Sequence, residues 1–320
     1  MSKLPWQAGT TPLMLAPMQG LTNNALRTCY IENYRPDIVF TEFVQVQSRS
    51  RKRVVKADVA DIASHRGAVP LVVQLIGNSA AALADAAKQL QDLGCDHLNL
   101  NLGCPYGRMT TGATGGELLN DPSKLGELLA ALRGAINGSF SVKCRAGYAD
   151  PQQLFELLPV YIDSGIDYLI IHPRTVLQKY TGAADHELTV AAASRCSIPI
   201  IANGDINDAV MGQRLLENSE ITGLMLGRGA LADPWLFERI RGARESGVDE
   251  QQRRLEVFEF LTDLLPRYAA RFCGERQTLM KLKDVLNFIT AECLQRDIGK
   301  LKRATTMERF AKILTSKFHS

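Results

Sequence analysis

The chain has 320 residues, of which 46% are hydrophobic and 22% are charged, with 25 Gly and 13 Pro. This composition is ordinary for a globular protein and excludes a collagen-like, a low-complexity and a wholly disordered chain. No stretch approaches the roughly 18 uncharged apolar residues of a membrane span, and residues 1–10 lack an apolar signal core, so we expect a cytoplasmic protein without a membrane partner.

The net charge of +3 is unevenly distributed. Residues 241–320 hold 16 Lys and Arg against 11 Asp and Glu, whereas residues 1–240 carry a small acidic excess. A basic segment on a nearly neutral body suggests a polyanionic partner, with nucleic acid as the leading candidate. The alternative is that a helical segment is mildly basic for solubility.

Short apolar runs alternate with helix-patterned segments over the first 230 residues. The runs are rich in Val, Ile and Leu, as strands buried on both faces should be, and they span 13–18, 38–44, 71–77, 97–103, 140–146, 167–174, 199–205 and 223–229. Residues 79–93, 123–136 and 154–163 have helical spacing, although Pro159 weakens the last of these. The alternation predicts an α/β fold, and the count of eight favours a (β/α)8 TIM barrel over a doubly wound open sheet.

The pattern changes after about residue 240, where strand-like runs stop. Residues 251–271, 275–294 and 300–317 have the pattern of charged amphipathic helices. We expect Pro266 to kink or end the first helix, and Gly274 and Gly299 to mark turns. The sequence therefore predicts a catalytic barrel over 1–240 and a small C-terminal α-helical domain over 241–320.

Reactive groups of such a barrel lie where the strands end at their carboxyl side. Most of the residues at these strand ends are polar or glycine. The set consists of Pro17, Met18, Gln19, Gln74, Asn99, Asn101, Cys104, Lys143, Arg145, His172, Arg174, Asn203, Gly204, Asp205, Gly227 and Arg228. Each one alone could simply reach solvent. Together they predict a functional mouth at this end of the barrel.

Gly204 and Gly227 follow the last two predicted strands, where barrels often bind a phosphate through closely approaching backbone N–H groups. Tight turns that need a positive φ are the other explanation for these glycines. Arg228 would add charge and a forked donor. Lys143 stands in an apolar strand, which is unfavourable unless the ammonium meets a negative partner. A flavin, which develops negative charge near N1 and O2 on reduction, satisfies that need.

Cys104 lies between Gly103 and Pro105, just past a predicted strand, with little to pack against. A free thiol has a pKa of about 8.5 and is mostly protonated at neutral pH, so it can donate a proton or act as a nucleophile. A hydrolase with a Cys–His pair, in which His172 is the base, is consistent with the same residues. The seven cysteines include no C-x-x-C pair, and we expect reduced thiols and no metal site.

The motifs at 15–20, 41–43, 74–75, 101–105, 142–145, 172–175, 202–205 and 227–230 resemble those of the tRNA-dihydrouridine synthases. The stretch Asn101-Leu102-Gly103-Cys104-Pro105 is the most specific. The resemblance implies an FMN-bearing barrel with a C-terminal helical domain that grips tRNA, and NADPH as the reductant. The motifs, the Gly115-Gly116 pair and the length are nearest to the bacterial C-type subgroup, which implies U16 of the D-loop as the target.

The resemblance also implies roles for individual residues. Contacts to FMN fall on Pro17, Met18, Gln19, Gln74, Lys143 and His172, and its phosphate end on Asn203, Gly204, Asp205, Gly227 and Arg228. Asn101 would orient the uracil, and Cys104 would protonate C5 while hydride reaches C6. We assign further substrate contacts to Arg145, Arg174, Gln45, Arg271, Arg276, Lys281 and Lys283. RNA contact by the basic run Arg49–Lys56 is a further expectation, against a solvated helix face.

Two other functions use the same mouth. An FMN barrel that reduces a small pyrimidine metabolite, like a dihydroorotate or dihydropyrimidine dehydrogenase, leaves the basic tail without a purpose. A non-catalytic RNA-binding barrel does not explain why Lys143, Cys104 and the glycines are all present. We therefore expect a tRNA-dihydrouridine synthase with tRNA and NADPH as partners, no DNA partner, and a monomeric state.

Overall fold

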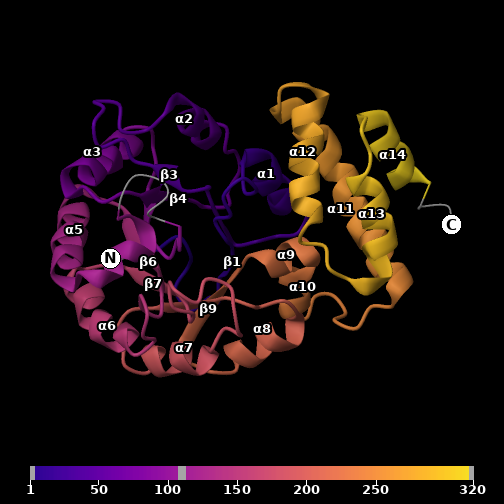
Figure 1. Ribbon diagram of the computed structural model, residues 1–320. Helices are drawn as coiled ribbons and strands as arrows, with labels where there is room; N and C mark the ends of the chain where they lie inside the picture. Colours follow the sequence, from indigo (N-terminus) through magenta and orange to yellow (C-terminus); the bar gives the residue numbers. More distant parts are fainter. Residues whose placement is uncertain (1–3, 107–112, 317–320) are drawn as a thin grey trace.

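The computed structural model describes residues 4–106 and 113–316 (Figure 1). Its strands form one parallel sheet in the order β2–β1–β9–β8–β7–β6–β5–β4, and pairing of β2 with β4 closes the ring. The strands are β1 (Leu13–Leu15), β2 (Ile38–Phe40), a short β3 (Val44–Gln45) beside β4, β4 (Leu71–Ile76), β5 (His97–Leu102), β6 (Ser139–Arg145), β7 (Tyr168–His172), β8 (Ile200–Asn203) and β9 (Ile221–Leu226). The predicted eight-stranded parallel barrel is confirmed.

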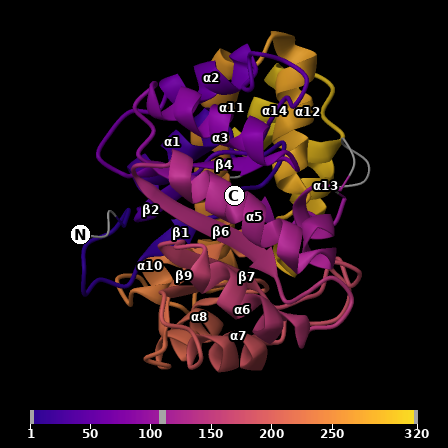
Figure 2. The same cartoon turned by 90° about the vertical axis from the view of Figure 1, so that its left-hand side faces the viewer.

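Helices surround the barrel and cover the outer faces of its strands (Figures 1 and 2). They are α1 (Asn24–Asn33), α2 (Lys56–Ala63), α3 (Ala80–Gln91), the 3-10 helix η1 (Gly115–Asn120), α5 (Pro122–Ala135), α6 (Gln153–Asp163), α7 (His186–Ala193), α8 (Ala209–Leu216), α9 (Arg228–Ala232) and α10 (Leu236–Ile240). Side-chain caps begin several of them; Ser79 and Asp121, for example, each accept a hydrogen bond from an N–H of the first turn.

The interior of the barrel is filled by apolar side chains at its amino end. Met14, Phe40, Ile170 and Met225 belong to this buried cluster. The Trp6 ring packs edge-on against Tyr168 at a centroid distance of 4.9 Å. Because this end is filled, a cavity inside the strands can open only at the carboxyl end.

The chain after the barrel forms a bundle of helices on one side of it, shown in orange and yellow in Figure 1. The bundle consists of α11 (Glu250–Arg271), α12 (Gly274–Leu286), the 3-10 helix η2 (Glu292–Leu294), α13 (Gln295–Lys302) and α14 (Met307–Thr315). Helix α11 packs against α1 of the barrel. None of the helices described is long and apolar enough to cross a bilayer. The domain boundary at residue 240 stays a prediction.

Several details of the predicted helices differ in the structure. Pro266, which we expected to kink or end the first helix, does not end α11; the helix continues to Arg271, because Leu264 and Tyr268 on either side of it are fully buried in the core. Gly299 lies inside α13 rather than in a turn. The predicted helix 275–294 is interrupted, because α12 ends at Leu286 and the short η2 begins only at Glu292. The predicted helix 300–317 is likewise divided between α13, which ends at Lys302, and α14, which begins at Met307. Gly274 does make a turn, with a φ of +78°, and Lys317 lies outside the described residues.

A buried carboxylate joins the bundle to the barrel. Glu256 on α11 has no exposed surface, and its two oxygens accept from Arg239 of α10 at 2.7 and 2.6 Å. Arg244 donates to the same carboxylate at 3.0 and 2.9 Å, while Arg239 also pairs with Asp233. Burial opposes ionisation of Glu256, but the arginines outweigh it, so the pKa of this carboxyl lies below its ordinary value.

We predict that Glu256→Gln lowers the free energy of unfolding by about 3–5 kcal/mol, because it leaves the buried Arg239 without its full counter-charge. Urea denaturation at pH 7 measures the change. The control is Glu259→Gln on the exposed side of the same helix, which should change stability by no more than about 0.5 kcal/mol. Equal effects of the two substitutions would contradict the role of Glu256.

Candidate functional site

The carboxyl ends of the strands surround one cavity of about 610 Å³, a size typical of small-molecule and cofactor sites. Most of the residues singled out in the sequence line it: Pro17, Met18, Gln19, Asn101, Cys104, Lys143, Arg145, His172, Asn203, Gly204, Asp205, Gly227 and Arg228. These residues stand on, or directly after, β1, β5, β6, β7, β8 and β9. The structure therefore brings together residues that are widely separated in the chain.

Of the strand-end residues singled out in the sequence, Gln74, Asn99 and Arg174 do not line this cavity. The Gln74 amide is fully buried and bonds to Asn99 and Asn101, each at 2.8 Å. The Arg174 guanidinium is also buried; it pairs with Asp205 and donates to the carbonyl of Gly182 at 2.6 Å. Both side chains support the wall of the cavity from behind.

Lys143 places its side-chain amine in the cavity. It stands on β6, and no hydrogen bond or ion pair links it to any of the residues the structure describes. Burial, and then the charge of Arg145, lowers the pKa of Lys143 from 10.5 to about 8. Such an amine favours a ligand that brings negative charge or an electron-accepting edge.

His172 ends β7 and is held as a neutral ring. Burial, followed by the charges of Lys143, Arg145, Arg174 and Arg228, lowers its pKa far below the ordinary value. The Nη1 of Arg174 lies 3.2 Å from the His172 Nε2, which acts as the acceptor in the neutral ring. A histidine with so low a pKa is a weak base, which argues against a hydrolase built on Cys104 and His172.

Glycines shape the opposite wall. Gly204 has a φ of +114°, and a Cβ there would lie 2.8 Å from the His172 ring, so only glycine is compatible with this turn. A Cβ on Gly227 would make only ordinary contacts, at 3.6 Å from the Ala16 Cβ and 3.8 Å from the Met18 sulfur. Arg228 is 42% exposed at this wall and pairs with Asp205 at 2.9 Å. Backbone without side chains beside an accessible guanidinium is a suitable cradle for a phosphate.

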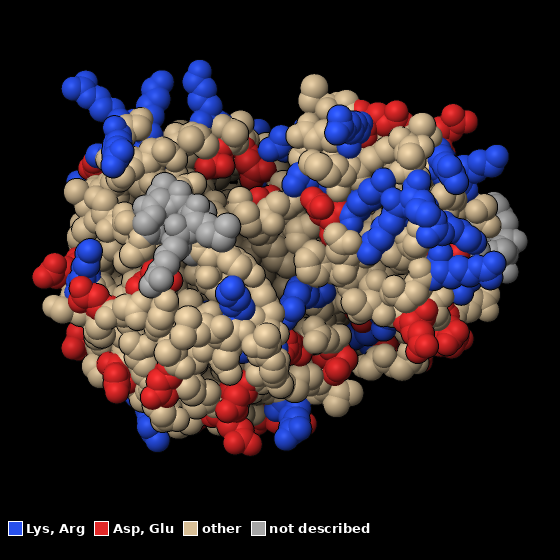
Figure 3. Space-filling model, viewed as in Figure 1, with Lys and Arg blue, Asp and Glu red and all other residues tan. Residues whose placement is uncertain are grey.

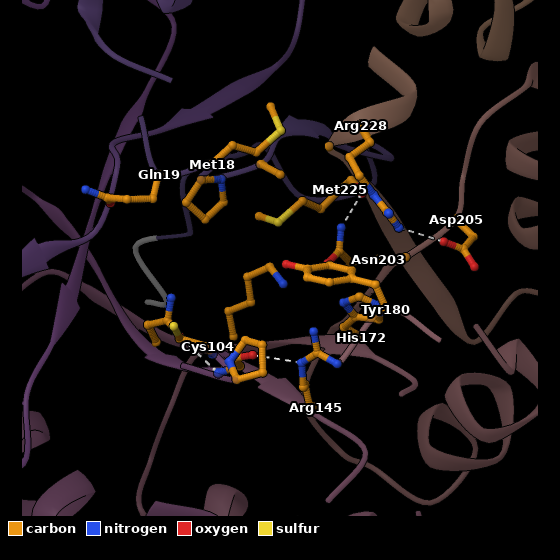
Figure 4. Close-up of a pocket in the computed structure, with 18 of the residues that line it drawn as sticks. Met18, Gln19, Cys104, Arg145, His172, Tyr180, Asn203, Asp205, Met225 and Arg228 are labelled. Atoms are coloured by element: carbon orange, nitrogen blue, oxygen red, sulfur yellow. Dashed lines mark hydrogen bonds and ion pairs between the residues drawn. The ribbon is translucent and has the colours of Figure 1, made fainter. Parts of the chain in front are cut away.

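Cys104 follows β5 in a segment fixed from both sides. The Asn101 Oδ1 accepts from the N–H groups of Gly103 and Cys104 at 3.0 and 2.9 Å. The Cys104 carbonyl accepts from the N–H of Gly116 at 3.1 Å. The thiol is partly buried at the edge of the cavity. Figure 4 shows it across the cavity from Arg228 and Asp205.

Tyr180 is a site residue that the sequence did not suggest. Its ring projects into the cavity from the loop after β7 (Figure 4) and is 49% exposed. The guanidinium groups of Arg145 and Arg228 lie 5.3 and 4.9 Å from the ring centroid. Phe288, which follows α12, also lines the cavity and brings the bundle to its edge. An aromatic residue in a strand-end loop is the only signal that could have pointed to Tyr180.

The predicted RNA contacts of the bundle differ in their surroundings. Lys281 donates to the carbonyl of Gly20 in the barrel at 3.3 Å, and Lys283 donates to the carbonyl of Ala304 within the bundle at 2.7 Å. Arg271 lies 3.6 Å from Asp61, and Arg276 is exposed. Gln45 is half-buried on β3 and does not line the cavity.

The surface around the hollow between barrel and bundle is unevenly charged. Figure 3 shows lysine and arginine side chains over the bundle on one side and along the opposite edge of the barrel. Arg49, Arg51 and Lys52, after β3, are exposed, whereas Arg53 is committed to Asp85 at 2.9 Å. The two basic regions could bind a polyanion that lies across the hollow.

The residues present fit a flavin mononucleotide. Lys143 offers an amine inside the cavity that bonds to none of the described side chains, and Gly204, Gly227 and Arg228 form a cradle at one wall. A closed parallel barrel with this rim is typical of barrel enzymes that bind a phosphorylated cofactor at their carboxyl end.

Comparison with known sequences identifies the family. The model of the dihydrouridine synthase family matches residues 14–316. A probable tRNA-dihydrouridine synthase of Rhodobacter capsulatus is 35% identical over 72% of this chain and 71% of its own. tRNA-dihydrouridine synthase B of Vibrio parahaemolyticus is 30% identical over 88% and 92%, and tRNA-dihydrouridine(16) synthase of Cupriavidus necator is 30% identical over 80% and 82%. The chain belongs to the dihydrouridine synthase family, whose members are flavin-dependent oxidoreductases.

Solved structures agree on the fold. The old yellow enzyme from Trypanosoma cruzi superposes with a TM-score of 0.53 over 74% of this chain and 89% of its own, at 11% identity. Morphinone reductase in complex with tetrahydroNAD gives a TM-score of 0.54 over 74% and 88%, at 14% identity.

We predict that Lys143→Met weakens FMN binding and stabilises the flavin-free protein. Because the pKa of Lys143 falls to about 8 in the folded state, its charged form opposes folding below pH 8, and this penalty disappears as the pH approaches 10.5. The stability advantage of the variant should therefore be largest near pH 7 and shrink towards pH 10. Urea denaturation of both flavin-free proteins across this range measures it. An advantage independent of pH would show that the charge is not responsible.

Proposed function

We propose that this protein reduces one uridine of tRNA to 5,6-dihydrouridine, with FMN in the rim cavity and NADPH as the reductant. The observation that carries the proposal is the presence of Cys104 and the unpaired Lys143 in one cavity of a dihydrouridine synthase barrel. FMN, when bound, supplies the hydride chemistry between NADPH and C6 of the uracil. The remaining steps fall to the side chains of the chain itself.

Lys143 would stabilise negative charge on the bound cofactor, and Arg228 with Gly204 and Gly227 would hold its phosphate end. The neutral His172 would line the site without adding another charge. The Cys104 thiol holds the proton that reaches C5 of the uracil. Saturating a C5–C6 double bond requires a proton as well as a hydride, so a fixed acid beside the base is needed.

The target base must leave its stack to reach this cavity, which costs a few kcal/mol. Charged contacts to the RNA backbone on both sides of the hollow would offset that cost. We propose Arg271 and Arg276 of the bundle, together with Arg49, Arg51 and Lys52 of the barrel, as these contacts. We propose Arg145 and Tyr180, which line the cavity, as contacts to the incoming uracil.

We further propose U16 as the target, a monomer as the working state, and the cytoplasm as the place of action, since tRNA is the substrate. The relatives carry both the B-type name and the position-16 name, so the subgroup stays a prediction.

The test uses tRNA prepared without modifications, the purified protein with its flavin, and NADPH. Wild-type protein should form dihydrouridine at one position, detected by mass spectrometry of the digested tRNA. Cys104→Ala should keep its flavin and still oxidise NADPH, but lose at least about 100-fold in uridine reduction, as expected for removal of a general acid. The control is Cys273→Ala, at an exposed thiol outside the cavity. Full activity of Cys104→Ala would refute the assignment of the acid.

A second prediction concerns RNA contact by the bundle. Arg276→Ala should weaken tRNA binding and reduce the slope of log affinity against log salt concentration by about 0.7 to 0.9, the value for one phosphate contact. Lys283→Met removes a charge that is already bonded within the bundle, and should change the slope less. Equal slopes for Arg276→Ala and wild type would remove Arg276 from the interface.

A further inference from the structure

Four buried polar side chains form a continuous hydrogen-bonded row beneath Cys104. Ser141 on β6, Asn99 on β5, Gln74 on β4 and Asn101 on β5 belong to it, and the most exposed of them, Asn101, is 9% exposed. The strand register places Gln74 beside Asn99, and Asn99 beside Ser141. We call this row the amide ladder. It rests inside the barrel wall, and of its members only Asn101 lines the cavity.

The direction of every bond in the ladder is fixed by the Cys104 segment. The backbone N–H groups of Gly103 and Cys104 can only donate, so Asn101 must present its oxygen to them. The Asn101 NH₂ therefore faces Gln74, which accepts at 2.8 Å through its Oε1. Reversal of the Asn101 amide would break all three bonds.

The same logic continues down the ladder. Because the Gln74 oxygen is occupied, its NH₂ donates to the Asn99 Oδ1 at 2.8 Å. The Asn99 NH₂ then donates to the Ser141 Oγ at 2.8 Å, and the Ser141 hydroxyl points to the carbonyl of Leu98 at 3.5 Å. Each amide thus has one orientation, set by its neighbours. Reversing any one of these buried amides would leave a donor or an acceptor without a hydrogen-bond partner.

Other contacts restrain the backbone around Cys104. The Arg145 Nε donates to the carbonyl of Gly103 at 2.8 Å. A Cβ on Gly115 would lie 2.9 Å from the Cβ of Cys104, so this glycine permits close packing there. Cys104 itself lies in a loop, and Pro105 after it offers no N–H. On its amino side, the Asn101 oxygen is the group that binds the peptide N–H of Cys104.

We propose that Asn99 is a positioning residue, which acts through Gln74 and Asn101 to hold Cys104 where its thiol can protonate the substrate. The proposal rests on the proposed function and names how its acid is oriented. Asn99 is the informative member, because it does not line the cavity and so cannot act by touching cofactor or substrate. Ser141 is the far anchor of the same row.

The key variant is Asn99→Leu, which removes the acceptor for Gln74 and frees the amides above it. Asn99→Asp keeps that acceptor, and Ser141 can turn to donate to the new carboxyl, so this variant should largely restore function. The matched control is His97→Leu. His97 lies two residues earlier on the same strand and bonds across to Ser139 at 2.8 Å, away from Cys104.

Two measurements on the flavin-loaded proteins test the proposal. The first is the alkylation rate of Cys104 by iodoacetamide, relative to the exposed Cys273, by mass spectrometry. This ratio should rise in Asn99→Leu, whose Cys104 segment is less restrained, and stay at the wild-type value in Asn99→Asp and His97→Leu. The second is the kinetics of uridine reduction, where Asn99→Leu should lose about 10- to 100-fold in kcat, with KM for tRNA and the rate of NADPH oxidation unchanged.

The outcomes are distinct. An unchanged alkylation ratio together with unchanged kcat in Asn99→Leu would overturn the proposal, and so would equal losses in Asn99→Leu and His97→Leu. Loss of flavin from Asn99→Leu with an unchanged ratio would also overturn it, because the ladder would then serve the cofactor pocket. If Asn99→Leu does not fold, Ser141→Ala should raise the ratio by a smaller factor. Absence of dihydrouridine with wild-type protein would instead refute the proposed function, whereas the alkylation result does not depend on it.

Discussion

The common direction of the barrel strands is the constraint on which the rest of the structure depends. A closed ring of parallel strands delivers every carboxyl end to one rim. The other end is filled by an apolar cluster and closed by Trp6 against Tyr168. Polar side chains inside the strands can therefore reach solvent or a ligand only at the rim. For this reason Lys143 and Cys104 line the same cavity, although Lys143 stands on β6 and Cys104 follows β5.

Much of this arrangement could be predicted from the sequence, because it depends on periodicity and strand count. The eight apolar runs gave the barrel, and the polar residues after them gave most of the cavity. The environments of single side chains could not be predicted. Gln74 and Arg174 follow the same pattern as their neighbours, yet they bond behind the wall. Pro266 stays within a helix because buried neighbours hold both sides of it in the core.

The seam between barrel and bundle illustrates a different limit of sequence reasoning. Glu256 looks like any charged residue of an amphipathic helix, but the fold buries it against Arg239 and Arg244. Lys281 likewise reaches across to the barrel carbonyl of Gly20, beside the loop that carries Met18 and Gln19. Such contacts depend on how two helical surfaces meet. They fix the bundle at one angle to the cavity.

The position of Phe288 determines when the lining of the cavity is completed during synthesis of the chain. The side chain comes from beyond α12, yet it forms part of the same chamber as Met18 and Lys143. The barrel leaves the ribosome first, and its cavity lacks this side chain until residues 241–320 have been synthesised and docked. A newly made barrel thus has its strands and its thiol but an incomplete cavity lining. Completion of the last segment supplies the missing side chain together with the basic helices that we propose bind tRNA.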